Sequence, residues 1–292
     1  MSFSIGMEED LHQKQMKDKC LKLLREYTQH ENVKFTSLGD SAIFGALSIA
    51  KQHGYTDVII PDQGGWLSYQ TFPLLLDMHI INIKTDQGIL LVDELKKYTH
   101  AALLFSSFAG YAAAQDLTQI ASIAKQNDFF IIEDASGAVS HKDLCNGAIS
   151  DIIIASFGRW KIVNLGNGGF LSIKKKYLTQ QVKESDIFSL IKPNNLDYNI
   201  LYEKLKKAPG RLQFLLKKTK EVKQLCQKEK FELIHADAEG IAVFVKFKSD
   251  KEKEKIITFC KQHTIAYKEC PMYIKILEKA ISMEIKRMEC II

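Results

Sequence analysis

The stretch from residue 128 to residue 169, DFFIIEDASGAVSHKDLCNGAISDIIIASFGRWKIVNLGNGG, decides the fold of this chain. It contains two short apolar runs, at 128–134 and 151–157, that are rich in isoleucine and phenylalanine. Such runs are typical of strands buried on both faces of a parallel sheet. The first run ends at Glu133-Asp134, and side chains at the carboxyl ends of parallel strands face the ligand crevice. We therefore expect an α/β fold with a ligand site at this edge.

Earlier in the chain, strand-like runs alternate with helical patterns. The spacing of apolar residues predicts an amphipathic helix from Glu8 to about Tyr27 and a second helix from near Ser41. Between them and the deciding stretch lie helical patterns such as SYQTFPLLLD and LTQIASIAKQN, and strand-like runs at 56–61, 78–84 and 101–107. This alternation predicts a mostly parallel sheet covered by helices on both faces. We place this large domain at residues 1–180.

The order of elements changes after residue 180. Two lysine-rich helical patterns come first, and the segment 232–247 then has the character of a pair of strands. Further helices are predicted near 250–263 and near 275–289. This succession is typical of an α+β arrangement, so we place a smaller C-terminal domain at residues 181–292.

Composition narrows the class of protein. The chain has 292 residues, of which 46% are hydrophobic and 26% charged, as in ordinary globular proteins. No apolar run approaches the roughly 18 residues of a membrane span, and the start lacks the order of a signal peptide, so a cytoplasmic protein without a membrane partner is expected. The net charge of +5 comes largely from lysines spaced as on solvated helix faces, which does not favour nucleic-acid binding. The six cysteines lack zinc-site spacing, so no metal is predicted.

Three local patterns follow one another in the deciding stretch. They are the acid pair ending in Asp134, the turn SFGRWK ending in Lys161, and the glycines of 166–169. Taken singly, each has an ordinary explanation, such as a helix N-cap or a surface lysine. The glycines lead into a strand-like run, whereas the glycines of a dinucleotide site lead into a helix. The sequence therefore argues against a Rossmann-type NAD site.

As an ordered series, E-D-A, S-F-x-x-x-K and G-x-G-G, these patterns resemble the DegT/DnrJ sugar-aminotransferase family. That resemblance implies the aspartate-aminotransferase fold (fold type I) and the cofactor pyridoxal 5'-phosphate (PLP). It also implies that Lys161 holds the cofactor as a Schiff base and later moves a proton, and that Asp134 pairs with the pyridinium nitrogen. Such a lysine and such an acid are what the protein contributes to this cofactor's chemistry.

The same resemblance supplies further candidate cofactor-binding residues. The segment LGDSA stands where the family has its S-G-T-x-A phosphate cup. Trp66 is placed to stack on the pyridine, although a core or interface tryptophan is an alternative. Asn199 matches the asparagine of G-Y-N-x-R, which reaches the cofactor across a dimer interface. The cofactor-binding candidates are Gly39, Asp40, Ser41, Trp66, Asp134, Ser156, Lys161 and Asn199.

Three positions depart from the family pattern. Asp40 replaces a threonine of the phosphate cup, Gly137 replaces a glutamine near the cofactor's phenolic oxygen, and Leu201 replaces an arginine. The resemblance implies a homodimeric aminotransferase that acts on a keto or amino sugar, for instance one linked to a nucleotide, with a glutamate-like amino donor. The departures keep two alternatives open: other PLP chemistry, such as elimination by a lyase, and a non-catalytic relative that serves as a binding or scaffold subunit.

Overall fold

A computed structural model describes residues 2–289, with the backbone alone described for residues 2–10. Its largest element is a seven-stranded sheet in the order β1-β11-β10-β9-β6-β2-β3. The four pairs from β3 to β10 are parallel, while β11 runs antiparallel between β10 and β1. This confirms the predicted α/β class. The strands are β1 (Asn32–Thr36), β2 (Asp57–Pro61), β3 (His79–Ile83), β6 (Ala101–Ser106), β9 (Phe129–Asp134), β10 (Ile152–Ser156) and β11 (Gly169–Ile173).

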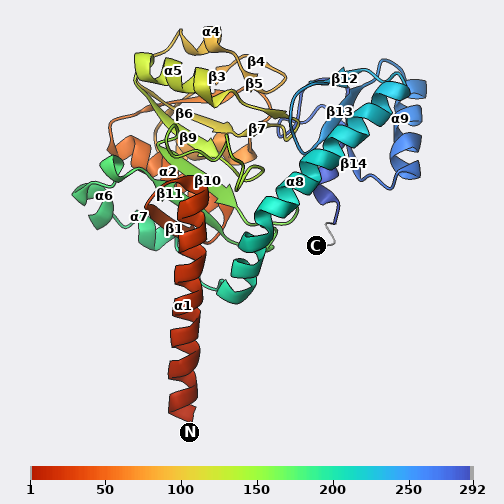
Figure 1. The fold of residues 1–292 in the computed structure, drawn as a ribbon. Helices are drawn as coiled ribbons and strands as arrows, with labels where there is room; N and C mark the ends of the chain where they lie inside the picture. The colour runs from red at the N-terminus through yellow and green to blue at the C-terminus, as the bar shows by residue number, and fades with distance from the viewer. Residues whose placement is uncertain (1, 290–292) are drawn as a thin grey trace.

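Helices cover both faces of this sheet (Figure 1). Alternate residues of β9 enter different cores: Phe129 and Ile131 pack on one face, while Phe130 and Ile132 pack on the other. The first core includes residues of α5 (Leu117–Asn127) and the second includes residues of α2 (Gly39–Gln52). Because side chains alternate along a strand, Glu133 and Asp134 at the end of β9 face these two layers separately.

A long helix, α8 (Tyr198–Lys228), connects the large sheet with the C-terminal part of the chain. Asp197 caps it, because its Oδ1 accepts hydrogen bonds from the backbone amides of Asn199 and Ile200 at 2.9 and 3.0 Å. Its first turns lie beside α1 (Ser2–Thr28), and its far end reaches the second sheet (Figure 1). Helices α6 (Gln180–Glu184) and α7 (Ile187–Ile191) precede it, and α7 packs on α2. The domain boundary near residue 180 stays a prediction.

The C-terminal part contains a four-stranded antiparallel sheet in the order β12-β13-β15-β14. The predicted strand pair and the helix near 250–263 are confirmed, but the final helix near 275–289 is wrong. There the chain forms a strand and a 3-10 turn, because the apolar run AISM is buried in the sheet and the charged residues around it are buried in pairs. The elements are β12 (Leu233–Ile234), β13 (Val243–Lys246), α9 (Asp250–Gln262), β14 (Tyr267–Cys270), β15 (Ala280–Met283) and η3 (Ile285–Arg287).

Several short elements complete the fold. The pattern SYQTFPLLLD does not form one helix; its Pro73 lies inside a four-residue helix that follows a separate 3-10 turn. Among residues 2–289, no helix has the length and apolar character that crossing a bilayer requires. The five described cysteines are buried free thiols, and Cys290 lies outside the described residues. The short elements are η1 (Leu67–Tyr69), α3 (Phe72–Leu75), β4 (Thr85–Asp86), β5 (Ile89–Leu90), α4 (Val92–Leu95), β7 (Phe108–Ala109), β8 (Ala113–Ala114) and η2 (Lys175–Tyr177).

Candidate active site

Lys161 lies in a tight loop between β10 and β11. The loop is closed by backbone hydrogen bonds from the amides of Leu165 and Gly166 to the carbonyl of Phe157, both 2.8 Å. Trp160 has a positive φ of 62°, and its amide donates to Asn164 Oδ1 at 2.8 Å. These contacts turn the chain so that the Lys161 side chain points into the protein instead of toward solvent.

Within the protein, the Lys161 ammonium meets aromatic rings and acids. Its Nζ donates a hydrogen bond to the hydroxyl of Tyr111 and lies 5.1 Å from the centre of the Trp66 ring. Burial lowers the pKa of Lys161, but the charge of the Tyr111 oxygen and of Asp134 outweighs burial and raises the pKa overall. In this arrangement the lysine is therefore held as a cation beside an acid.

Asp134 ends β9 on the same side of the sheet as α2. Its Oδ2 accepts a hydrogen bond from the Tyr69 hydroxyl, and its Oδ1 accepts one from the Ser136 amide, both at 2.9 Å. Burial and the charge of Asp134 raise the pKa of Tyr69 well above its usual value. Tyr69 therefore remains a neutral donor that keeps the carboxylate in place.

The start of α2 approaches the end of β10 very closely. A Cβ on Gly39 would lie 2.5 Å from the Cβ of Ser156, so only glycine permits this approach. Asp40, in the first turn, accepts hydrogen bonds at its Oδ1 from Trp66 Nε1 and Ser68 Oγ, both at 2.8 Å. The carboxylate that replaces the family's threonine is thus held by side chains of the segment that follows β2.

These side chains line one narrow cavity of about 100 Å³. Six of the eight residues predicted from the sequence are brought together there: Gly39, Asp40, Trp66, Asp134, Ser156 and Lys161. Residues far apart in the sequence meet because β9 and β10 end side by side, with Ile154 of β10 paired to Asp134 of β9. No three histidine, cysteine, aspartate or glutamate side chains gather as metal ligands within the described part of the chain.

Two predicted residues do not line this cavity. The Ser41 hydroxyl instead shares a 2.7 Å hydrogen bond with the Ser37 hydroxyl. Asn199, at the start of α8, has its Oδ1 2.8 Å from Nε2 of His12. Leu201, which replaces the family's arginine, is fully buried in the core. Asn199 stays a prediction that only a second subunit can satisfy.

Sequence reasoning missed two tyrosines that contact the site. Tyr69 hydrogen bonds to Asp134, and Tyr111 hydrogen bonds to Lys161. Tyr69 belongs to a segment that looked like one helix, and Tyr111 lies in a short hairpin between β7 and β8. Neither tyrosine stands in a motif, so only the spatial arrangement identifies it.

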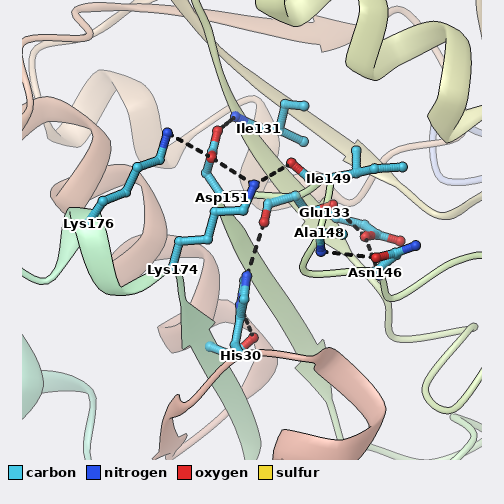
Figure 2. Close-up of polar contacts among 11 residues, drawn as sticks. His30, Ile131, Glu133, Asn146, Ala148, Ile149, Asp151, Lys174 and Lys176 are labelled. Atoms are coloured by element: carbon cyan, nitrogen blue, oxygen red, sulfur yellow. Dashed lines mark hydrogen bonds and ion pairs between the residues drawn. The ribbon is translucent and has the colours of Figure 1, made fainter.

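Glu133, the other acid of the pair, belongs to a separate cluster on the opposite face. It is fully buried and accepts four hydrogen bonds, from Ser107 Oγ, Ser150 Oγ and the amides of Cys145 and Asn146, at 2.6 to 3.3 Å. Figure 2 shows this carboxylate near the ion pair of Asp151 with Lys174, and His30 nearby. The saturated carboxylate organises the loop between β9 and β10 and has no access to the cavity.

Comparison with known proteins places this arrangement in a family. Residues 18–199 match the DegT/DnrJ/EryC1/StrS aminotransferase family, and residues 213–291 match the MJ1341 family C-terminal domain. No curated protein matches the chain. The first match covers the whole large sheet and the cavity, so it concerns the same residues that the geometry singles out.

Solved structures with low sequence identity share the fold. DndA from Streptomyces lividans is 10% identical with a TM-score of 0.74, and the match covers 95% of this chain and 90% of that one. Serine palmitoyltransferase from Sphingomonas wittichii is 14% identical with a TM-score of 0.71, over 92% and 70% of the two chains. NtdA from Bacillus subtilis, with its cofactor PMP bound, is 16% identical with a TM-score of 0.69, over 92% and 72%.

The family match extends over more than half of the residues and agrees with the order of motifs read from the sequence. The family is PLP-dependent, in agreement with the cofactor that the sequence predicted. This chain belongs to the DegT/DnrJ/EryC1/StrS aminotransferase family.

Proposed function

We propose that this chain is a PLP-dependent aminotransferase in which Lys161 attaches the cofactor and Asp134 pairs with its ring nitrogen. The observation that carries the proposal is that Lys161 and Asp134, from different strand ends, line one cavity together with the glycine-opened start of α2. The cofactor's aldehyde requires a primary amine, and its pyridine nitrogen requires an acid. Its phosphate requires backbone amides at the start of a helix.

Each group has a separable task in this proposal. The bound cofactor supplies an electron sink for the electron pair released at the substrate's α-carbon. Asp134, held by Tyr69 and the Ser136 amide, keeps a negative charge beside the ring nitrogen. The amine of Lys161 takes a proton from the substrate carbon and returns one, because a general base must lie within hydrogen-bond reach of the reacting atom. Trp66 lines the same cavity and would stack on the pyridine ring.

The acceptor that we propose is a keto sugar, for instance one linked to a nucleotide, which a glutamate-like amino donor converts into the amino sugar. The support is family membership and the resemblance of motifs. We also propose a cytoplasmic homodimer, in which Asn199 of each subunit faces the partner's cofactor.

Covalent trapping tests the attachment. The purified protein is mixed with PLP, reduced with borohydride and digested, and the modified peptide is identified by mass spectrometry. We expect the modification at Lys161, and none there in Lys161→Ala. Lys174→Ala is the matched control, because Lys174 lies at the opposite face, paired with Asp151 at 3.2 Å, and its loss should leave the trapping at Lys161 intact. Modification spread over surface lysines, with Lys161 unmodified, would contradict the proposal.

The reaction type is tested with L-glutamate. A transaminase moves the amino group to the cofactor and releases 2-oxoglutarate, whereas an elimination releases ammonia. We expect the 2-oxo acid in an amount equal to the bound cofactor and no ammonia. Release of ammonia from amino-acid or amino-sugar substrates would favour the lyase alternative instead.

A specific observation favours the alternative of a non-catalytic relative. The cavity is narrow, and the Asp40 carboxylate at the start of α2 would repel the cofactor's phosphate. Trapping at Lys161 without turnover of any amino donor would support this alternative. Binding of sugar nucleotides by that same protein would then identify it as a binding subunit.

A further inference from the structure

The hydrogen-bond partner of the Lys161 amine is Tyr111, which belongs to no sequence motif. Tyr111 lies in the hairpin between β7 and β8, with a positive φ of 75°. Its hydroxyl accepts the hydrogen bond of Lys161 Nζ. Its carbonyl accepts a 2.7 Å hydrogen bond from the Ile241 amide, so the C-terminal part of the chain holds the hairpin in place.

Tyr111 also explains the glycine that departs from the family pattern. A Cβ built on Gly137 would lie 3.1 Å from Cδ1 and 3.3 Å from Cε1 of the Tyr111 ring. Gly137 does not have a positive φ, so its backbone permits a side chain. The Tyr111 ring is the tightest neighbour of that position, and Cδ2 of Phe108 lies 3.4 Å from the same Cβ. A side chain at position 137 would therefore press on the Tyr111 ring, which would have to shift to make room for it.

The ring of Tyr111 is contacted by two lysine side chains from the C-terminal part. Lys286 Nζ lies 3.4 Å from the ring centre, and Lys275 Nζ lies 5.1 Å from it. Lys275 in turn forms a buried 2.6 Å ion pair with Glu284. Burial and the neighbouring charge of Lys275 lower the pKa of Lys286 well below its usual value. The Lys275 ammonium, paired with Glu284, and the Lys286 side chain pack near the ring and restrain its orientation.

We infer that the Tyr111 hydroxyl takes over the task of the missing glutamine and donates a hydrogen bond to the phenolic oxygen of the cofactor. The inference rests on the proposed function, because it requires the cofactor to be attached at Lys161. In PLP the phenolic oxygen and the aldehyde are on adjacent ring carbons. A hydroxyl in contact with the lysine nitrogen is therefore a neighbour of both groups, and a phenol is an effective donor to an ionised oxygen.

A spectroscopic titration tests the inference without reference to turnover. The visible absorbance of bound PLP is followed from acid to alkaline pH in the wild type and in Tyr111→Phe. We expect the midpoint of the variant to rise by about one pH unit, a tenfold change in proton affinity. The phenolic oxygen, having lost its donor, holds the proton that it shares with the lysine nitrogen more tightly. Tyr27→Phe is the control, since the Tyr27 hydroxyl donates to the Leu205 carbonyl at the α1–α8 contact.

The possible outcomes distinguish a failure of the proposed function from a failure of the inference about Tyr111. A wild type without any PLP absorbance overturns the proposed function. A wild type that binds PLP at Lys161, with the same midpoint in Tyr111→Phe, overturns only the inference about Tyr111. A raised midpoint in a folded Tyr111→Phe protein supports the inference.

A swap of the two positions makes the test sharper. Gly137→Gln alone should weaken PLP binding about tenfold or more, because the new side chain displaces the Tyr111 ring. In Tyr111→Ala combined with Gly137→Gln, the amide gains the vacated room, and the midpoint should return toward the wild-type value. If Tyr111→Ala alone and the double variant have the same midpoint, the two positions do not share one contact and the inference fails.

Discussion

Two acids adjacent in β9, Glu133 and Asp134, lie on opposite faces of the sheet and differ in their access to the cavity. Glu133 accepts four hydrogen bonds from the protein and is fully buried in the layer that includes α5. Asp134 accepts two on the other face and also lines the cavity with Lys161. We call the first the closed centre (Glu133, Ser150 and His30) and the second the open centre (Asp134, Tyr69 and Lys161).

The difference teaches how the same residue type serves stability or chemistry. A carboxylate whose acceptor positions are all used by the protein cannot bind a ligand, but its removal leaves buried donors without partners. A carboxylate that lines a cavity retains capacity for a ligand. Substitution at the closed centre should therefore act on folding, and substitution at the open centre should act on cofactor binding.

Loss of the closed carboxylate should have the largest effect. Glu133→Ala leaves the Ser150 hydroxyl and two amides unpaired and leaves the Ser107 hydroxyl only its 3.3 Å hydrogen bond to the Asp134 carbonyl. At about 1 kcal/mol or more for each lost partner, we expect the free energy of unfolding to fall by about 3 to 4 kcal/mol. Urea denaturation of the cofactor-free protein measures this change. Glu94→Ala, which removes only a surface pair with Lys97, is the control and should change it by less than about 1 kcal/mol. A Glu133 variant as stable as this control would show that the centre is not structural.

The closed centre should also make stability depend on pH. His30 Nε2 donates to the Ser150 carbonyl at 3.1 Å, and burial together with the charge of Lys174 lowers the pKa of His30 to about 4. The unfolded chain, with a histidine pKa near 6.5, binds the proton first, so stability falls as pH drops from about 6.5 to about 4. The loss should approach about 3 kcal/mol.

This contribution of His30 is measured by urea denaturation of the wild type and of His30→Asn across this pH range. The difference between their free energies of unfolding isolates His30, since other groups titrate equally in both proteins. We expect the difference in stability to shrink toward acid pH. A difference that stays constant would mean that His30 is not held neutral.

At the open centre, Asp134→Asn should act mainly on the cofactor. Removing the charge beside the ring nitrogen should weaken PLP binding about 30-fold, the equivalent of about 2 kcal/mol. The free energy of unfolding of the cofactor-free protein should change by less than about 1 kcal/mol, because the amide still accepts the Ser136 hydrogen bond. Equilibrium titration with PLP and urea denaturation give the two values. Glu133→Gln should instead lower the free energy of unfolding and leave PLP affinity nearly unchanged. If both variants change the two quantities equally, the two centres do not differ in function.

The smallest effect expected has the opposite sign. Asp40→Asn keeps an oxygen for the hydrogen bonds of Trp66 and Ser68 but removes a charge from the start of α2. We expect PLP to bind about fivefold more tightly, a gain of about 1 kcal/mol from reduced repulsion of its phosphate. Asp77→Asn, at a side chain that is 96% exposed, serves as the control in the same titration. Weaker binding in Asp40→Asn would mean that the carboxylate itself helps to hold the cofactor.

Local sequence was sufficient for the elements whose burial pattern is regular. The five predicted strands of the large sheet and the helix LTQIASIAKQN lie where their apolar residues indicated. Lys161, Asp134 and Gly39 were found from the order and spacing of motifs. The strand AISM was misassigned as helix because a short apolar run does not distinguish the two, and because nothing local shows that Lys275 and Glu284 form a buried ion pair.

The sequence by itself determined the class of fold, the family and the pair of residues, Lys161 and Asp134, that line the cavity, because these depend on periodicity and on short-range order. Only the tertiary structure decided which partners complete the site. Tyr69 meets Asp134, and Tyr111 fills the room beside Gly137, across intervals that no local pattern spans. It also decided that Glu133 is closed and Asp134 open, because alternation places them on opposite faces and each face packs against different segments.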